Sequence, residues 1–454
     1  MSQEKTLHRG LSRRHLEMIA IGGCIGTGLF MGSGKTISLA GPAIILIYAV
    51  TGLMLYFVMR AMGELLLHNS NYRSFVDFSE DLLGSQTAFF VGWSYWFAWI
   101  VTAIAETIAM TGYMTFWWPT LPAWISASVT VGILLMINLL AVKAFGELEF
   151  WLAIIKIVAI LGFIGLGSWL TLTHYISPEG TIAQLSNLWA YGGFFPHGEA
   201  GIMAALQTTI FAFAGMEIVG TLSAEAKDPK IALPNAIKKI PWRILVFYIG
   251  TVTVMMTVVP WIEISPDHSP FVGMFSLMGL ASAAAIVNFV ITSSATSSCN
   301  SGIFATSRML YGLAKIHNAP SLFGKLSSHH IPTRSVFLGT LLTLSAAVAL
   351  TATDSMMQAF QMVGSIAALL FIFIWTVILV AHIAYRKKFP DCHAKSSFKM
   401  PLSKPMTYVV LAFFALAIYA LSLDRLTRVA LYVLPLWFAL LAISYRLKRN
   451  ITSS

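Results

Sequence analysis

Three charged residues, Glu106, Lys156 and Glu217, stand deep inside long apolar stretches of the sequence. An ionisable side chain inside a membrane costs several kcal/mol, roughly, unless it is paired or reached by water, so such a residue is a functional candidate by default. Lys156 could release and regain a proton, or it could be a permanently charged pin to nearby carbonyls. Glu106 could accept a positively charged group or form an interhelical hydrogen bond. Glu217 could relay protons or brace the backbone beside it.

Two of these apolar stretches are interrupted by glycines, in GGCIGTGLF (Gly22 to Phe30) and, about half the chain later, in FAFAGMEIVG (Phe211 to Gly220). Hydrocarbon offers no water to freed backbone groups, so a non-helical segment at that depth must line a cavity or hold a ligand. Paired interruptions are typical of inverted-repeat transporters. The alternative is that the first run consists of small residues that only pack helices together.

The interruptions offer partners for the two charged groups of an amino acid. Consecutive amides at Gly26, Thr27 and Gly28 could donate to a carboxylate, because glycine permits close approach. Carbonyls freed around Phe211 could accept from an ammonium, while its ring is either a gate over the ligand or ordinary packing. The predicted substrate-binding residues are Ile25, Gly26, Thr27, Gly28, Glu106, Phe211, Ala212, Phe213 and Ala214.

Polar residues on two later stretches are candidates for the transport pathway. The run TSSATSSCNSG (Thr292 to Gly302) contains Ser297 and Asn300, and Ser365 lies further along the chain. These side chains could line the path, or they could hold helices together through hydrogen bonds. Lys156 and Glu217 are the residues predicted to couple protons to transport.

Composition predicts an all-α polytopic membrane protein, with 57% hydrophobic and 11% charged residues over 454 positions. Apolar windows predict about twelve transmembrane helices. Their expected limits are 16–38, 40–66, 86–117, 122–142, 149–173, 200–224, 240–262, 274–312, 335–353, 357–385, 404–423 and 428–447.

Basic residues occupy alternate loops, whereas the loops at 174–199 and 263–273 contain no Lys or Arg. The net charge of +10 therefore indicates membrane orientation, with both termini cytoplasmic, and not nucleic-acid binding. We expect a cytoplasmic tail at 1–15, a five-helix repeat at 16–175, a second, inverted repeat at 200–387, two further helices at 404–447 and a cytoplasmic tail at 448–454.

Several motifs resemble the amino acid/polyamine/organocation superfamily, and specifically its bacterial amino acid transporter family. They are GGCIGTGLF, MRAMGELL (Met59 to Leu66), GELEFWLAIIKI (Gly146 to Ile157), FAGMEIVG with SAEAKDP, and NSGIFATSRMLYGLA (Asn300 to Ala314). Within the family, IGTGLFMGSGKTISLAGP, SPFV and PLWF most resemble the branch for D-serine, D-alanine and glycine, through which cycloserine enters cells.

The resemblance implies a LeuT-like core of five plus five inverted helices with two helices added. It places Gly26, Thr27 and Gly28 at the substrate carboxylate, Phe211 at an aromatic gate and Lys156 at the position of a coupling cation. It also implies that Ala214 lines the pocket and that Glu217 is the acidic residue after the break. Glu106 stands where that branch has Asp, which puts the selectivity in doubt.

The predicted function is proton-coupled import of small neutral amino acids by alternating access, in a bacterial cytoplasmic membrane. The driving force is a proton gradient, with no cofactor and no metal, and the chain is a monomer or a weak homodimer in the lipid bilayer. The alternatives are a relative for aromatic, branched, proline or γ-aminobutyrate substrates, an exchanger without net proton coupling, and a transporter-like sensor or light-subunit-dependent assembly protein. A membrane enzyme is disfavoured because no catalytic spacing is present.

Overall fold

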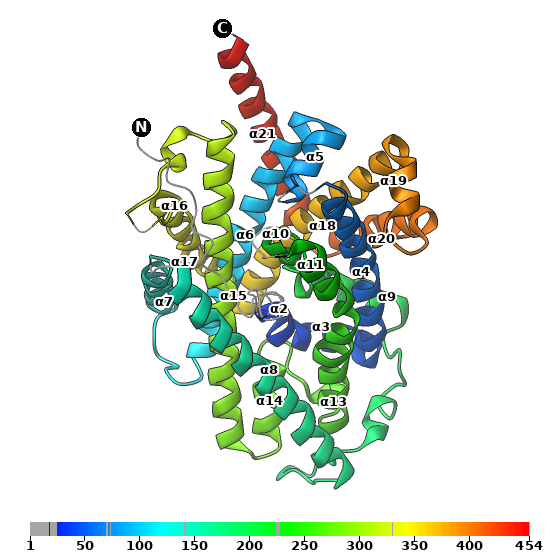
Figure 1. Ribbon diagram of the computed structural model, residues 1–454. Helices are drawn as coiled ribbons and strands as arrows, with labels where there is room; N and C mark the ends of the chain where they lie inside the picture. Colours follow the sequence, from blue (N-terminus) through cyan, green and yellow to red (C-terminus); the bar gives the residue numbers. More distant parts are fainter. Residues whose placement is uncertain are drawn as a thin grey trace.

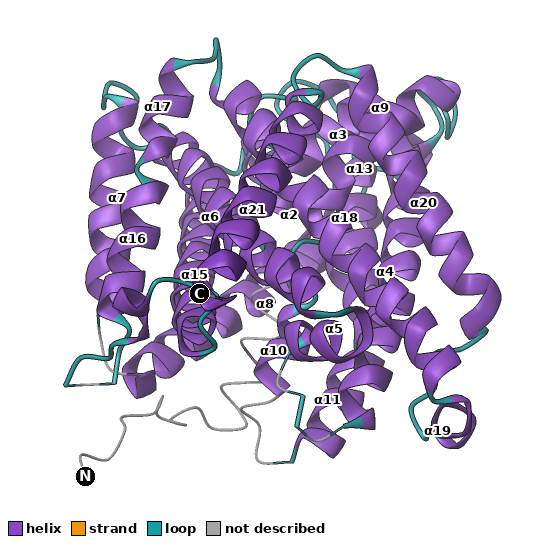
Figure 2. Ribbon diagram, turned by 90° about the horizontal axis from the view of Figure 1, so that it is seen from above, coloured by secondary structure: helices purple, strands orange, loops and turns teal. Residues whose placement is uncertain are grey.

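The computed structural model describes residues 18, 25–69, 71–72, 74–139, 142–223, 228–328 and 330–453. The tail predicted at 1–15, the first part of the predicted span 16–38 and the first three residues of GGCIGTGLF lie outside the described residues. The described regular structure is helical, apart from one isolated bridge between Ile176 and Ile182. Figure 2 shows this helical bundle and the loops that join its helices. The chain is therefore an all-α polytopic membrane protein.

The helices of the first half surround the centre of the molecule (Figure 1). In chain order they are α2 (Thr27–Phe30), α3 (Gly32–Ala40), α4 (Ile44–His68), α5 (Phe75–Leu83), α6 (Ser85–Met114), α7 (Ala123–Asn138), α8 (Val142–Leu172), α9 (Gly198–Ala212), α10 (Ile218–Ser223), α11 (Pro229–Lys238), α12 (Ile240–Arg243) and α13 (Thr251–Val258). A π-helical stretch, Ile244–Gly250, joins α12 to α13.

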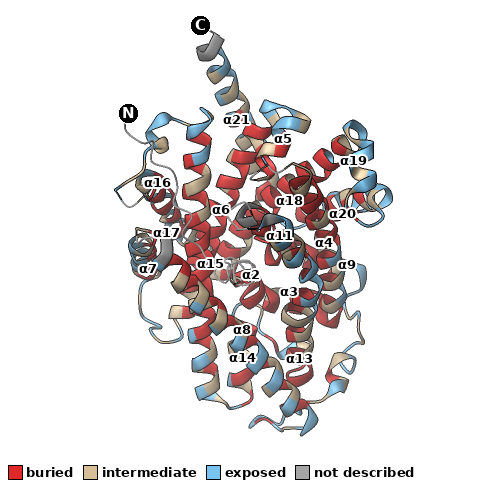
Figure 3. Ribbon diagram, viewed as in Figure 1, coloured by how far each residue is buried: buried red, intermediate tan, exposed pale blue. Residues whose placement is uncertain are grey.

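The second half contributes the two long helices that complete the core. Its helices are α14 (Pro270–Leu277), α15 (Ala281–Lys315), α16 (Thr333–Thr343), α17 (Ser345–Thr351), α18 (Met356–Lys388), α19 (Pro390–Lys395), α20 (Ser403–Leu423) and α21 (Val429–Ser453). Buried residues concentrate along α6, α15 and α18, and exposed ones on the periphery (Figure 3). The predicted span 274–312 needs correction, because Gly279 (φ +73°) turns the chain between α14 and α15.

Eight stretches of the described chain are long and apolar enough to cross a membrane by length and composition. Four of the twelve predicted spans are missing from that set for identifiable reasons. The first and sixth are interrupted, α7 has only 16 residues, and the polar run lowers the hydropathy of α15. The count of twelve therefore stays a prediction.

Both predicted interruptions are visible in the backbone. Gly26 is extended (φ −126°, ψ −164°) and directly precedes α2. The second break separates α9, which ends at Ala212, from α10, which begins at Ile218. Gly215 lies in this break with φ +91°, a conformation that costs glycine little and other residues much more. Glycine chemistry thus explains where the sixth span stops being helical.

Candidate functional site

The two interruptions touch each other at the centre of the bundle. A Cβ atom added to Gly28 would lie 2.6 Å from Ala212 Cα and 3.1 Å from the Phe211 carbonyl oxygen. Both atoms belong to a backbone, so they cannot move aside as a flexible side chain would. Only glycine at position 28 allows α2 to approach α9 this closely, and the contact brings the two non-helical segments to one site.

Glu106 on α6 closes the site from a third side. Its side chain is buried, and its Oε1 accepts hydrogen bonds from the Thr27 backbone N–H at 3.3 Å and from the Ser298 hydroxyl at 2.9 Å. Oε2 makes no hydrogen bond with any described residue. The carboxylate therefore ties α6 to α2 and α15, and one of its oxygens is left with acceptor capacity.

A small cavity lies between these elements. The volume of this cavity is about 10 Å³, roughly what one water molecule requires. Six of its lining residues are among the predicted substrate-binding residues, and three were not predicted. The lining consists of Gly26, Gly28, Trp99, Thr102, Glu106, Phe211, Ala212, Ala214 and Ser298. The predicted binding residues thus gather around one enclosed space, and their binding roles stay predictions.

The three unpredicted lining residues carried a signal in the sequence. Thr102 and Trp99 precede Glu106 by four and seven positions, which places all three on one face of α6. Ser298 lies in the polar run that supplied Ser297 and Asn300 as candidates. Helical periodicity applied to Glu106 would have found the first two.

The remaining predicted substrate residues lie beside the cavity. Thr27 is buried and donates its amide to Glu106, and the side chain of Ile25 is 1% exposed. Phe213 points elsewhere and stacks on Tyr248, with ring centroids 4.5 Å apart and planes at 11°. Phe211, by contrast, both lines the cavity and packs edge-on against Phe360. Of the two phenylalanines, Phe211 is the one positioned to cover a ligand.

Lys156 on α8 reaches the non-helical start of α2. Its ammonium donates to the Ile25 carbonyl at 3.3 Å, and the Ser294 hydroxyl of α15 donates to the same oxygen at 3.1 Å. The side chain of Lys156 is fully buried. The ammonium therefore lies where the first, fifth and eighth predicted spans meet.

Glu149, which the sequence did not predict as a site residue, is a second buried ionisable residue of α8, beside Lys156. It accepts hydrogen bonds from Ser297 and Asn300, both at 2.6 Å, and from Ser301 at 3.1 Å. The Asn138 side-chain amide of α7 donates in turn to Asn300 Oδ1 at 2.7 Å. Ser297 and Asn300 thus bind Glu149 and do not line the cavity. The missed signal was its spacing of seven positions from Lys156, which puts both on one face of the helix.

Glu217 follows the break in the sixth span, next to α18. Its Oε2 accepts a hydrogen bond from the Trp375 indole at 3.3 Å, and its side chain is fully buried. Ser365, also on α18, donates to the Met362 carbonyl of its own helix at 2.7 Å. Ser365 is not part of the cavity lining. The contact of Glu217 joins the broken helix to α18, which agrees with the bracing alternative.

Two broken membrane helices that meet at a small buried pocket define the class of transporters with discontinuous helices. Comparison with known proteins gives the family. The sequence model for "Amino acid permease" matches residues 15–452, and the chain belongs to the amino acid permease family.

The similarity to named relatives extends over almost the whole chain. A D-serine/D-alanine/glycine transporter of Escherichia coli (strain K12) is 50% identical over 97% of this chain and 94% of its own length. The amino-acid permease AapA of Bacillus subtilis (strain 168) is 44% identical over 98% of this chain and 96% of its own. A probable threonine/serine transporter of the same bacterium, YbxG, is 41% identical, covering 99% and 98%.

Proposed function

We propose that this chain imports small neutral amino acids by alternating access, namely glycine and both the L and D forms of alanine and serine. The observation that carries the proposal is the cavity between the two broken helices, lined by a carboxylate and by the small residues Gly26, Gly28, Ala212 and Ala214. The similarity to a D-serine/D-alanine/glycine transporter supports this substrate class. The close approach of α2 and α9 backbone at Gly28 leaves little room on those sides of the cavity, which favours small side chains.

The contacts of Glu106 suggest how substrate binds. The substrate carboxylate takes over the Thr27 amide, which Glu106 Oε1 occupies at 3.3 Å, together with the neighbouring amide of Gly28. Glu106, released from that amide, then accepts the substrate ammonium. Because the cavity has room for about one water molecule, the lining must open to admit an amino acid.

Proton coupling is proposed to run through Lys156. Its ammonium and the Ser294 hydroxyl share the Ile25 carbonyl, so a change in the charge of Lys156 alters the hydrogen bonding of the segment that leads into α2. Glu149 provides a negative charge about two helical turns away on the same face of α8, roughly 10 Å along the axis. Glu217 braces the second break through Trp375.

The proposed topology has both termini in the cytoplasm of a bacterium and the chain in the cytoplasmic membrane. The two inverted repeats, 16–175 and 200–387, are supported by the equivalent positions of the two breaks, each in the first span of its repeat. The last two helices, expected at 404–447, correspond to α20 and α21. The assembly is proposed to be a monomer or a weak homodimer.

The test is uptake by the purified protein in liposomes under an inward proton gradient. We expect labelled D-alanine to accumulate, to leak out when the gradient is collapsed, and to be displaced by D-serine and glycine. Inhibition by aromatic or branched amino acids but not by D-serine and glycine would overturn the substrate class. Uptake that is insensitive to collapse of the gradient would overturn proton coupling and favour an exchanger.

A further inference from the structure

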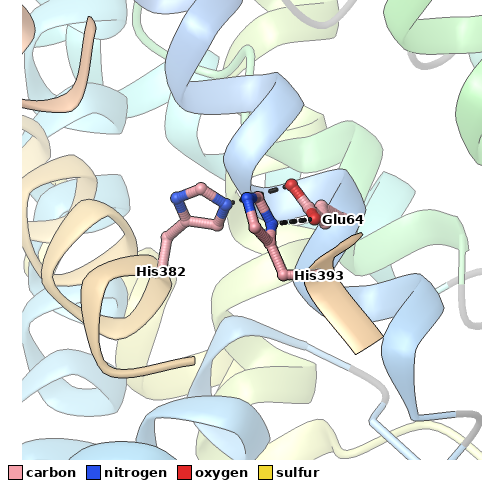
Figure 4. A group of neighbouring side chains, drawn as sticks. All are labelled: Glu64, His382 and His393. Carbon is pink, nitrogen blue, oxygen red and sulfur yellow. Dashed lines mark hydrogen bonds and ion pairs between the residues drawn. The ribbon is translucent and has the colours of Figure 1, made fainter. Parts of the chain in front are cut away.

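A cluster of two imidazoles and one carboxylate lies outside the transport site (Figure 4). Glu64 belongs to α4, His382 to α18 and His393 to the short helix α19. The side chains of Glu64 and His382 are 0% exposed, and that of His393 is 14% exposed. Two neighbouring helices, α18 and α19, and the distant helix α4 therefore place their ligating atoms in one largely buried corner.

The distances within the cluster show that both imidazoles face the carboxylate of Glu64. Glu64 Oε2 lies 3.0 Å from His382 Nε2, and Glu64 Oε1 lies 2.7 Å from His393 Nδ1. One ligand atom from each residue lies within 4.8 Å of the other two. In Figure 4 both rings turn a nitrogen toward the carboxylate of Glu64.

We propose that Glu64, His382 and His393 bind a divalent transition metal of the zinc class. Two imidazole nitrogens and one carboxylate are a common donor set for zinc, with bonds of about 2.0–2.2 Å. At tetrahedral angles such bonds place ligand atoms about 3.4 Å apart. The two contacts with Glu64 need to widen by only about half an ångström to reach that spacing, within the reach of small side-chain rotations.

Groups around the cluster are arranged to orient its ligands. The Met400 backbone N–H donates to Glu64 Oε2 at 2.9 Å, which fixes the carboxylate. The Ser403 hydroxyl lies 3.3 Å from His393 Nε2, the ring nitrogen that faces away from Glu64. A metal-bound histidine commonly engages its second nitrogen in such a contact. An ion would enter past His393, because His393 is the one member of the cluster whose side chain is partly exposed.

The position of the cluster gives a bound ion a structural consequence. It would bridge α4 to α18 and fasten α19, a helix of six residues that follows α18 after one residue. Because the ion binds the folded protein and cross-links three segments, it should raise the unfolding temperature, and the rise should grow with the concentration of free ion. This inference does not depend on the proposed transport function.

The test uses the full-length protein, purified in detergent and stripped of metal with a chelator. Zn²⁺ binding is measured by competition with a chromophoric chelator, and Co²⁺ serves as a spectroscopic substitute that reports nitrogen and oxygen ligands. We expect one ion per chain and a rise in unfolding temperature with Zn²⁺. His382→Gln and His393→Gln should each weaken binding at least about tenfold.

Two controls separate this site from other binding. Cys392→Ser removes an exposed thiol beside His393, and His268→Gln removes an exposed histidine elsewhere. Both variants should bind Zn²⁺ as the parent does. Absence of stoichiometric binding in the parent protein, whatever the folding of the variants, would leave the cluster as a hydrogen-bonded triad only. Binding that survives both cluster variants, or that disappears with Cys392→Ser, would also overturn the proposal.

Discussion

Replacing Gly28 with Ala tests whether the contact between the two broken helices is required. The new Cβ would lie 2.6 Å from Ala212 Cα and 2.9 Å from Ala212 N, whereas ordinary carbon contacts begin near 3.4 Å. The helices must therefore separate locally by about 1 Å, and overpacking of this kind costs about 1–3 kcal/mol. A free-energy difference of about 1.4 kcal/mol changes an equilibrium constant tenfold. The population of the arrangement in which α2 contacts α9 should therefore fall about 5- to 150-fold.

The assay is gradient-driven uptake of labelled D-alanine in liposomes, with thermal unfolding in detergent measured on the same preparations. Gly28→Ala should reduce uptake at least about fivefold and lower the unfolding temperature, although alanine retains the backbone amide. Gly132→Ala on α7 is the matched control, because nothing lies within 4 Å of its added Cβ. Parent-like uptake and stability in Gly28→Ala would refute the view that the close approach of α2 and α9 forms the site.

Lys156→Ala should abolish proton-driven accumulation but leave some exchange of labelled for unlabelled substrate, and retained accumulation would remove Lys156 from the coupling mechanism. Glu149→Gln keeps an acceptor oxygen but removes a buried negative charge near Lys156, so accumulation should fall at least about tenfold and the unfolding temperature should also fall; parent-like accumulation would limit Glu149 to packing. Outside the membrane spans, a hydrogen bond from Tyr72 and the charge of Lys388 lower the pKa of Asp81. The ionised Asp81 stabilises the fold above its unfolded-state pKa and loses this effect as the pH falls through the folded-state value. The unfolding temperatures of the parent and Asp81→Asn should therefore differ slightly at neutral pH and converge below about pH 4; a constant difference down to pH 3, roughly, would contradict this account.

The breaks could be predicted from the sequence because each depends on the chemistry of individual glycine residues. Gly215 adopts φ +91°, and Gly28 lies against the backbone of α9. Both positions require glycine, and a glycine within an apolar run is visible in the sequence. Glu106 and Lys156 were equally predictable, because a charged side chain in an apolar run is costly to bury and is therefore a functional candidate. These signals are local, so they survive without any knowledge of how the helices pack.

Features that depend on packing between distant segments were not predictable in the same way. Glu149 was overlooked because it lies at the edge of the predicted span 149–173, where a charge is unremarkable, although the structure buries it under α15. The contact of His393 with Glu64 joins positions 329 residues apart. The roles of Phe211 and Phe213 also depended on packing, because two aromatic residues two positions apart at the end of α9 have no periodicity to distinguish them.

The contacts of Glu106 link the location of the pocket to its selectivity. Its carboxylate already accepts a long hydrogen bond from the Thr27 amide, at 3.3 Å. In the proposed mechanism, a substrate carboxylate therefore competes with a carboxylate of the protein for the same donor. The substrate carboxylate displaces Glu106 only if Glu106 binds another group, and in this proposal that group is the ammonium of the same substrate. A molecule with only one of the two charged groups, such as a simple carboxylic acid or a simple amine, cannot complete this exchange. On this reasoning the site selects for the amino acid backbone by the exchange at Glu106, and selects for a small side chain by the backbone of α2 and α9.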